Sequence, residues 1–294
     1  MFSIIVPSYN RQAEIPSLLD SLSQQTCHNF EVVIVDDCSP QAVALEGSYP
    51  FSVTLVRNQQ NQGAAQSRNI GVAQAKYDWL LFLDDDDRFL SNKCEVLAQT
   101  IAQNPEVNFI YHPAECRMVN EGFTYFTKPY ADPQLLTLDN ILRVNKIGGM
   151  PMLAVKKALF EQVGGLSADL YSLEDYDFVL KLLTAPNFKA KYVPQALTRC
   201  VFHTKRASVS TNLGNIEKAI EQIEAKFVKT PQQQQSFALN RLYMLVYPNI
   251  MNLSRKAASY YWQMFKLTKN LKMLVIASVI LISPKLAINM KRFF

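Results

Sequence analysis

Short apolar runs alternate with longer segments of helical periodicity along the first third of the chain. Residues 3–9 (SIIVPSY) have the pattern of a continuous buried strand, and residues 11–26 have that of the helix after it. A loop and an Ala-rich helix are expected over residues 61–76. Further strands are expected at residues 30–39, 51–58 and 78–87. This alternation predicts βαβ units around a mainly parallel sheet, and therefore an α/β fold.

Polar residues stand at the end of each of these expected strands. They are residues 7–9, Asp36 and Asp37, Arg57 and Asn58, and residues 84–87. Parallel sheets bind ligands in the crevice beyond the carboxyl ends of their strands. We therefore expect the functional site at this edge, with the size of a nucleotide.

The pattern loosens after about residue 91. Helices are expected within residues 92–104, 134–145, 157–166 and 170–183, and short strands within 107–112, 114–119, 123–127 and 191–203. The short strands predict a mixed or antiparallel extension of the sheet. From about residue 213 the pattern is helical to the end, with residues 231–236 (PQQQQS) as a polar link. His28 and His112 have no polar company in the sequence and are expected at the surface.

Charge is distributed unevenly along the 294 residues. The net charge is +5, but the segment from Arg241 onward holds nine Lys or Arg and no Asp or Glu, so the first 240 residues carry 5 − 9 = −4. The length suits one large α/β domain with an appendage, or two domains. Five scattered cysteines without metal spacing predict reduced thiols in a cytosolic protein.

The C-terminal segment combines apolar faces with this positive charge. Over residues 254–274 the apolar positions recur at helical spacing, at Tyr260, Met264, Leu267, Leu271 and Leu274. The apolar run at 273–283 is too short to span a bilayer, which needs about 20 residues. Two interpretations stay open: helices packed on the rest of the chain or on a second copy, or a segment lying on an anionic membrane surface. The absence of acidic residues favours the membrane.

Four consecutive aspartates, Asp84 to Asp87, follow the fourth expected strand. A solvated acidic loop is one interpretation, and helix capping explains one Asp at most. A hard divalent cation explains the others, because Mg²⁺ or Mn²⁺ binds one or two carboxylates together with substrate phosphates. Asp87 is expected to cap the next turn or to be solvated.

These segments together resemble a known family. The runs SIIVPSYNR, VVIVDDCSP, NQGAAQSRNIGVAQAKYDWLLFLDDDD and EDYDF are similar, in order and spacing, to those of the family 2 glycosyltransferases. The resemblance covers residues 1 to about 210. It implies the GT-A fold, a Rossmann-like, mainly parallel sheet flanked by helices. It also implies inverting transfer of a sugar, usually from a UDP-sugar, with Mn²⁺ or Mg²⁺.

The resemblance assigns most of the expected donor site. Asp86 matches the metal ligand of the D-x-D motif, Asp84 would face the ribose or a metal-bound water, and Asp85 fills the variable middle place. The nucleoside pocket matches Pro7, Tyr9, Asp36 and Asp37, with Asp37 favoured as the uracil partner and Asp36 as the cap of the following turn. Arg68 matches a donor-contacting arginine, and Gly63 allows close approach of the backbone to the ligand.

Two further segments complete the expected site. Asp175 matches the base that removes the acceptor proton, and Glu174 would orient the acceptor. By the same resemblance, His203 completes the metal shell. Arg206 and Ser208 lie in the basic, hydroxyl-rich loop HTKRASVS, which suits a diphosphate. Without the resemblance, the acidic residues 174–177 would be interpreted as charges at a helix start.

The resulting prediction is a metal-dependent inverting glycosyltransferase, transferring a hexosyl or N-acetylhexosaminyl group to a glycan or lipid-linked acceptor of a bacterial surface polysaccharide. It would be cytoplasmic and peripheral on the inner face of the membrane, with no nucleic-acid partner and with oligomerisation left open. We expect a catalytic domain at 1–212 (nucleotide half 1–110, acceptor half 111–212) and a helical region at 213–294. One alternative is a nucleotidyltransferase, although residues 7–16 (PSYNRQAEIP) lack the Gly-rich, Lys-bearing loop it needs. The other is a non-catalytic UDP-binding membrane scaffold.

Overall fold

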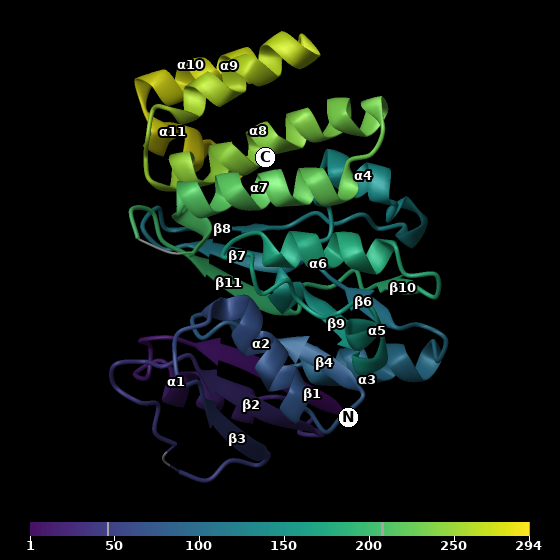
Figure 1. Cartoon of the computed structure of the whole chain (residues 1–294). Coiled ribbons are helices and arrows are strands. Elements are labelled where there is room, and N and C mark those ends of the chain that lie inside the picture. The colour runs from purple at the N-terminus through teal and green to yellow at the C-terminus, as the bar shows by residue number, and fades with distance from the viewer. Residues whose placement is uncertain (46, 207–208, 294) are drawn as a thin grey trace.

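The computed structural model describes residues 1–45, 47–206 and 209–293, and they form two sheets covered by helices (Figure 1). The larger sheet has the spatial order β10 (Ala190–Tyr192), β6 (Phe109–Tyr111), β9 (Leu153–Lys156), β4 (Trp79–Phe82), β1 (Phe2–Ser8), β2 (Phe30–Asp36) and β3 (Ser52–Arg57). The smaller sheet has the order β5 (Arg88–Phe89), β11 (Thr198–Phe202), β7 (Ala114–Met118) and β8 (Phe123–Phe126).

Helices cover both sheets and form the C-terminal region. The α-helices are α1 (Ile15–Ser23), α2 (Gly63–Gln74), α3 (Lys93–Gln103), α4 (Leu138–Arg143), α5 (Lys157–Gln162), α6 (Glu174–Leu183), α7 (Leu213–Phe227), α8 (Pro231–Met251), α9 (Ala257–Thr268), α10 (Leu271–Ile282) and α11 (Pro284–Asn289). The described residues also form short 3₁₀ helices: η1 (Pro133–Leu135), η2 (Met150–Met152), η3 (Val209–Thr211) and η4 (Met290–Phe293).

The parallel core of the larger sheet confirms the expected βαβ pattern. β1 lies between β2 and β4 and runs parallel to both, so that Ile4 stands between Val32 and Leu81. β3 continues the parallel arrangement, whereas β9 is antiparallel to β4 and β6. Because β1, β2 and β4 share one direction, their carboxyl ends open at one edge, and the polar residues that follow them meet there.

The second half of the chain confirms the expected mixed extension. β7 is parallel to β11 and antiparallel to β8, and β5 is antiparallel to β11. The single helix expected at 134–145 is instead split into η1 and α4. The reason is the side chain of Thr137, which accepts a hydrogen bond from the Asn140 backbone N–H and starts a new helix there.

Two further expectations from the sequence are wrong. Residues 231–236 are the first turns of α8 and not a link, because Thr230 and Gln233 form a capping box and Pro231 occupies a first-turn position where no N–H is needed. His112, expected at the surface, is fully buried. It directly follows β6, and its backbone N–H donates to the carbonyl of Met152. His28 is exposed, as expected.

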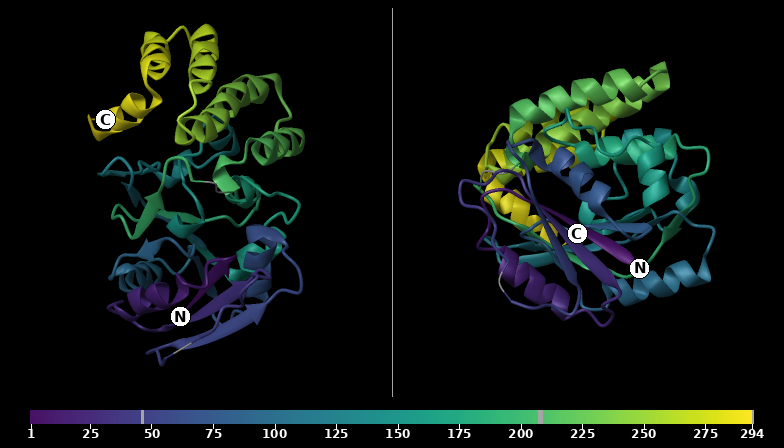
Figure 2. Two further views of the ribbon diagram at one scale, coloured as in Figure 1. Left: turned by 90° about the vertical axis from the view of Figure 1, so that its left-hand side faces the viewer. Right: turned by 60° about the horizontal axis from the view of Figure 1, so that its bottom comes forward.

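The helical C-terminal region packs on the α/β part through a shared core. Apolar residues of α7 and α8, among them Ile220 and Phe237, belong to the same buried cluster as Phe178 of α6 and Ile5 of β1. Figure 2 shows α9, α10 and α11 at the end of the molecule opposite the N-terminal strands. In the described part of the chain, every helix is too short or too polar to cross a membrane. The division of the chain at residue 212 stays a prediction.

The close contact of α2 with the sheet gives a testable prediction. A Cβ built on Gly71 would lie 2.5 Å from Ile5 Cγ2 and 3.2 Å from Val35 Cγ2, so the helix can approach the sheet only without a side chain there. Gly71→Ala should lower the free energy of unfolding by about 1–3 kcal/mol, as overpacking does. Urea denaturation measures this change.

Gly214→Ala is the matched control in α7, where the nearest atom to the added Cβ is Asn212 Oδ1 at 3.7 Å. It should leave the stability unchanged or raise it by up to about 1 kcal/mol through helix propensity. Equal effects of the two substitutions would contradict the packing argument.

Candidate active site

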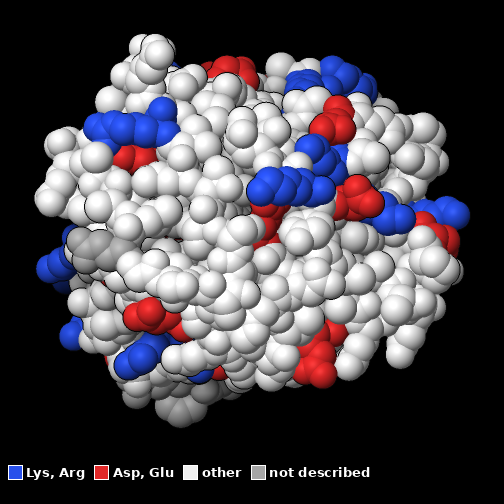
Figure 3. Space-filling view, turned by 90° about the horizontal axis from the view of Figure 1, so that it is seen from below, with Lys and Arg blue, Asp and Glu red and all other residues white. Residues whose placement is uncertain are grey.

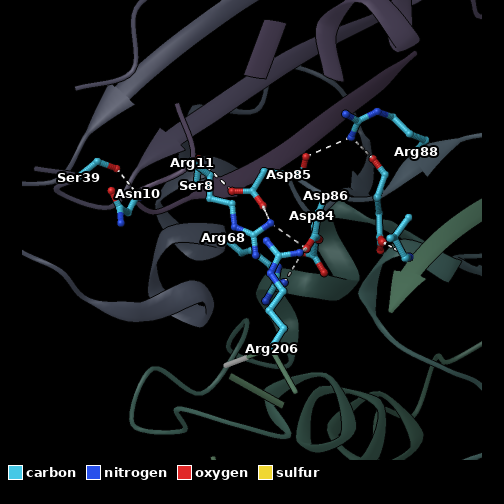
Figure 4. A network of polar contacts seen from close by, with 12 residues as sticks. Ser8, Asn10, Arg11, Ser39, Arg68, Asp84, Asp85, Asp86, Arg88 and Arg206 are labelled. Atoms are coloured by element: carbon cyan, nitrogen blue, oxygen red, sulfur yellow. Dashed lines mark hydrogen bonds and ion pairs between the residues drawn. The ribbon is translucent and has the colours of Figure 1, made fainter. Parts of the chain in front are cut away.

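Three arginines from distant parts of the chain surround the acidic run that follows β4 (Figure 4). Arg11, after β1, approaches Asp86 Oδ2 at 2.8 Å and Asp85 Oδ1 at 3.6 Å. Arg206, after β11, lies 3.7 Å from the same Oδ2 of Asp86. Arg68 of α2 contacts Asp84 at 2.6 Å. These contacts offset the mutual repulsion of consecutive carboxylates.

Arg68 links the acidic run to the start of α6. Its side chain is 5 % exposed and donates to Asp84 Oδ1 at 2.6 Å and to Glu174 Oε1 at 2.8 Å. Burial by itself would lower the pKa of Arg68, but the two carboxylates raise it well above its usual range. Its Nε atom is buried and lacks a hydrogen-bond partner among the described residues. Arg68 therefore orients two carboxylates, and its contact with a donor stays a prediction.

The other two aspartates of the run are buried and serve the fold. Asp85 accepts a hydrogen bond from Ser8 Oγ at 3.0 Å, and burial raises its pKa to about 6 against the opposing charge of Arg11. Asp87 accepts from the Val201 backbone N–H at 3.0 Å and is 6 % exposed. Asp87 is therefore not solvated; it joins the acidic run to β11.

Asp36 ends β2, Asp37 follows it, and the two have separate structural tasks. Asp36 accepts hydrogen bonds from the backbone N–H groups of Ser39 and Val43 and pairs with Arg57 at 2.6 Å. Although burial acts in the opposite direction, these hydrogen bonds and the arginine lower the pKa of Asp36. Asp36 caps the following turn, as expected.

Asp37 fixes the start of α2. It accepts from the backbone N–H groups of Gln62 and Gly63, each at 2.8 Å, and from Asn58 Nδ2 at 2.8 Å. A carboxylate offers about four lone-pair sites. Three of them are used here, so one further N–H is all that Asp37 can accept.

The remaining expected nucleoside contacts lie at the same edge. Tyr9 is 50 % exposed directly after β1, and Pro7 is partly buried within β1. Gly63 has a φ of +84°, which favours glycine, and a Cβ there would lie 3.4 Å from the ring of Tyr171. An exposed aromatic ring and a glycine therefore flank the buried Asp37.

Asp175 lies beside Glu174 at the start of α6, after Leu173 in the left-handed conformation (φ 57°). Its Oδ1 accepts from the Tyr176 N–H at 2.7 Å. Its Oδ2 faces Gly149, where a Cβ would approach it to 3.2 Å. Burial, and then the charge of Glu174, raises the pKa of Asp175 to about 7. A carboxyl group that titrates near neutrality is suited to general-base work.

The segment after β11 holds the other predicted residues. His203 is partly buried, and Ser208 lies outside the described residues. Thr204 bonds to Asn120 and Glu121, which anchors this segment on the hairpin of β7 and β8. Of the predicted residues here that the structure describes, Arg206 has a defined contact with the acidic run, through Asp86.

The residues at this edge fit a divalent cation in part. Among the described residues, no group of three His, Cys, Asp or Glu side chains forms a ready-made metal centre. The side chains of Asp84 and Asp86 are 37 % and 31 % exposed, and their carboxylate oxygens are the ligands that Mg²⁺ and Mn²⁺ prefer. One or two carboxylates suffice where substrate phosphates supply the other ligands. The roles of Asp86 and His203 in metal binding stay predictions.

Sequence reasoning missed Arg11 and Ser8, which contact the aspartates directly. Ser8 follows Pro7 in the strand, so a place at the sheet edge was foreseeable, but its partner was not. Arg11 could have been suspected, because a run of adjacent carboxylates favours nearby cations and Arg11 follows the first expected strand. The pairing itself joins residues 75 positions apart and depends on the parallel contact of β1 with β4.

Comparison with known proteins now adds to this geometry. Residues 3–164 match the model of the family described as glycosyl transferase family 2. The chain is 61 % identical over 292 residues to an uncharacterized glycosyltransferase of Haemophilus influenzae, covering 99 % of both chains. It is 26 % identical over 263 residues to WfgD of Escherichia coli, a UDP-Glc:alpha-D-GlcNAc-diphosphoundecaprenol beta-1,3-glucosyltransferase, covering 88 % of this chain and 96 % of WfgD.

Solved structures show the same fold. TarS 1–349 of S. aureus, in complex with UDP-GlcNAc, has a TM-score of 0.56 at 19 % identity, covering 99 % of this chain and 91 % of that one. The mannosyltransferase PcManGT of Pyrobaculum calidifontis, in complex with GDP-Man and Mn²⁺, has a TM-score of 0.55 at 18 % identity, covering 100 % and 87 %. The expected GT-A type α/β fold with a helical C-terminal region is therefore confirmed, and the chain belongs to glycosyltransferase family 2.

Proposed function

We propose that this glycosyltransferase moves a sugar from a UDP-sugar to a glycan or lipid-linked acceptor of a bacterial surface polysaccharide, with inversion. The observation that carries the proposal is the link from Asp84 through Arg68 to Glu174, because it sets the acidic run beside Asp175. A donor-binding group and a base must be adjacent for direct displacement. The similarity to WfgD, whose name gives UDP-Glc and a diphosphoundecaprenol-linked sugar, supports the donor and acceptor classes.

The donor would lie along the carboxyl edge of the larger sheet. Tyr9 would stack on the uracil ring, and the remaining lone-pair site of Asp37 would accept the uracil N3–H. The guanidinium of Arg206, whose side chain is 39 % exposed, would donate to the diphosphate, because arginine pairs well with phosphate oxygens. The TarS complex with UDP-GlcNAc supports a UDP-sugar on this fold.

Asp86, together with Asp84 and His203, would hold a divalent cation. Such a cation supplies charge stabilisation to a departing diphosphate. Arg11 and Arg206 contact Asp86 Oδ2 and would keep this carboxylate oriented toward the donor. The Mn²⁺ in the PcManGT complex supports a metal in this fold.

Asp175 would remove the proton from the acceptor hydroxyl while that oxygen attacks the anomeric carbon. The bond from the anomeric carbon to the diphosphate oxygen breaks on the opposite side, so the configuration inverts. Glu174 is held by Arg68 and would orient the acceptor beside the base. Asp175 needs to be ionised for this step, and its raised pKa places that ionisation near neutrality.

Asp86→Asn tests the donor half of this proposal. It should lower Mn²⁺-dependent hydrolysis of UDP-sugars by at least about 100-fold, since the metal contributes several kcal/mol of charge stabilisation. A screen of UDP-sugars for released UDP measures this and also identifies the donor. Asp78→Asn, an exposed acid at the opposite end of β4, is the matched control and should keep full activity. Metal-dependent hydrolysis at the normal rate in Asp86→Asn would exclude Asp86 as the ligand.

Asp175→Asn tests the acceptor half. It should retain UDP binding but lose transfer by about 10²–10⁴-fold, the usual contribution of a general base. In the unaltered protein, transfer should rise as the pH increases through about 7, because the raised pKa keeps Asp175 protonated below that pH. Transfer to lipid-linked acceptors over a pH series measures both effects. Binding of UDP without transfer in the unaltered protein would instead indicate a non-catalytic UDP-binding scaffold.

The C-terminal helices would bring the enzyme to an anionic membrane surface. Seven large apolar side chains on α9, α10 and α11 are 44–71 % exposed: Trp262, Leu267, Leu271, Val275, Leu281, Ile282 and Leu286. Lysines accompany them, and the segment from Arg241 onward has no acidic residue. The opposite end of the molecule, which carries β2 and β3, shows basic and acidic side chains side by side (Figure 3). The combination of exposed apolar and basic residues is typical of helices that lie in a lipid interface.

The triple variant Leu271→Ser, Leu281→Ser, Ile282→Ser tests this placement. Its binding to phosphatidylglycerol vesicles should fall by at least about 10-fold. Each large apolar side chain that is fully buried in lipid contributes roughly 1.5 kcal/mol to the free energy of binding. Vesicle sedimentation measures the bound fraction, and salt should weaken binding of the unaltered protein. Tyr77→Ser, an exposed aromatic before β4, is the control. Equal binding of all three proteins, or binding to neutral vesicles alone, would argue against the membrane role.

A further inference from the structure

Lys93 is a titratable residue in the interior that the proposed reaction does not use. It is the first residue of α3 and is 0 % exposed. Its Nζ donates to the Pro151 carbonyl at 2.7 Å and to Thr198 Oγ1 at 2.9 Å, and it lies 3.8 Å from the centre of the Phe89 ring. Burial of an ammonium group costs several kcal/mol unless its donors are satisfied. An apolar residue of similar length would avoid that cost. The presence of a lysine here therefore suggests that its hydrogen bonds have a task.

The contacts of Lys93 join three segments around the proposed site. Phe89 lies in β5, directly after the acidic run. Thr198 begins β11, which leads to His203 and Arg206, and its hydroxyl also donates to the Pro151 carbonyl at 2.8 Å. Pro151 lies in η2. Two donors therefore converge on one backbone carbonyl of η2, which fixes its position relative to both strands.

The turn that Lys93 holds is the wall beside Asp175. Gly149 precedes η2, and a Cβ on it would lie 3.2 Å from Asp175 Oδ2. Gly148 has a φ of +119°, and a Cβ there would meet Met152 Cε at 1.9 Å, so the turn has no room to repack with larger residues. A displacement of η2 would thus change both the space and the water around the carboxyl group of Asp175.

The surroundings of Lys93 hold no carboxylate bonded to it among the described residues. Burial lowers the pKa of Lys93 to about 7. The titratable groups that act electrostatically on Lys93 are Cys94, Cys200 and Asp87, and they oppose this shift. His112 is also fully buried nearby; burial, and then the charge of Lys93, lowers the pKa of its imidazole well below the usual value. Its Nε2 has no hydrogen-bond partner among the described residues. A neutral imidazole without a contact to Pro151 cannot replace the ammonium there.

We propose that Lys93 is a positioning residue: it fixes η2 against Asp175, and ties that wall to the acidic run and to β11, without touching substrate. The proposal rests on the proposed function of Asp175 as the base. It assigns a task in acceptor activation to a side chain that belongs to the donor half of the expected domain. Its predicted effect is mainly on transfer, because its hydrogen bonds hold Pro151 and Thr198 and none of its contacts reaches Tyr9 or Asp37, the proposed uracil-binding residues.

Lys93→Met keeps the length of the side chain and removes its donors. Transfer should fall by roughly 10- to 100-fold, as expected for a shift of about 1 Å in a catalytic group. Binding of UDP should be unchanged. In the unaltered protein, the acid limb of the pH–rate profile for transfer lies near pH 7. In Lys93→Met this limb should move to lower pH, because a loosened wall lets water reach Asp175 and reduces the effect of burial on its pKa. A merely structural loss would lower the amount of active protein and leave the limb in place.

Lys157→Met is the matched control, because Lys157 Nζ also donates to a backbone carbonyl, that of Ala75, at 2.9 Å. It should keep the normal rate and the normal acid limb. If Lys93→Met does not fold, Thr198→Val decides, because it removes the second donor to Pro151 and should shift the limb in the same direction. An unshifted limb in whichever of these two variants folds would overturn the positioning role alone. Absence of an Asp175-dependent limb in the unaltered protein would overturn the base and the positioning role together.

Discussion

The consecutive carboxyl groups after β4 depend on three arginines, which contact Asp84, Asp85 and Asp86, and on burial, which raises the pKa of Asp87 to about 8. Arg11, Arg68 and Arg206 come from the turn after β1, from α2 and from the segment after β11. They do not contribute equally. The pair of Arg206 and Asp86 is long and partly exposed, which limits it to at most about 1 kcal/mol. Arg68 is buried between two carboxylates, and loss of such a partner typically costs about 3–5 kcal/mol.

The charge network also explains how the two halves of the site are kept in register. Arg68 reaches the site because α2 lies flat on the sheet, which Gly71 permits. Its second contact holds Glu174, the first residue of α6. Leu173 adopts a left-handed backbone at that point, a conformation that costs a β-carbon-bearing residue about 1 kcal/mol or more. The surrounding contacts outweigh that cost, and Asp175, which follows Glu174, faces Gly149.

Burial gives the acidic groups of the site different properties although their sequence context is similar. Asp84 and Asp86 remain partly exposed and can meet a ligand, whereas Asp85 and Asp87 point into the protein and bond to Ser8 and to β11. The same contrast separates Glu174, which is paired with Arg68, from Asp175, whose pKa is raised. Proximity in sequence therefore does not give these residues one role.

The sequence by itself determined the α/β fold, the strands of the parallel core and the edge at which the polar residues gather. Those features follow from local apolar periodicity and from the rule that parallel strands share one open edge. Asp36 was expected to cap a turn and does so through neighbours a few residues away, but Asp37 likewise accepts backbone N–H groups, at the start of α2.

Only the tertiary structure decided which cations meet the acidic run, that His112 is buried, and that Lys93 lies under the wall of the proposed base. Each of these depends on contacts between residues tens of positions apart, whose pairing is set by packing of whole elements and has no local signal. The polar segment 231–236 joined α8 for a local reason, the capping box, which its glutamine-rich composition concealed.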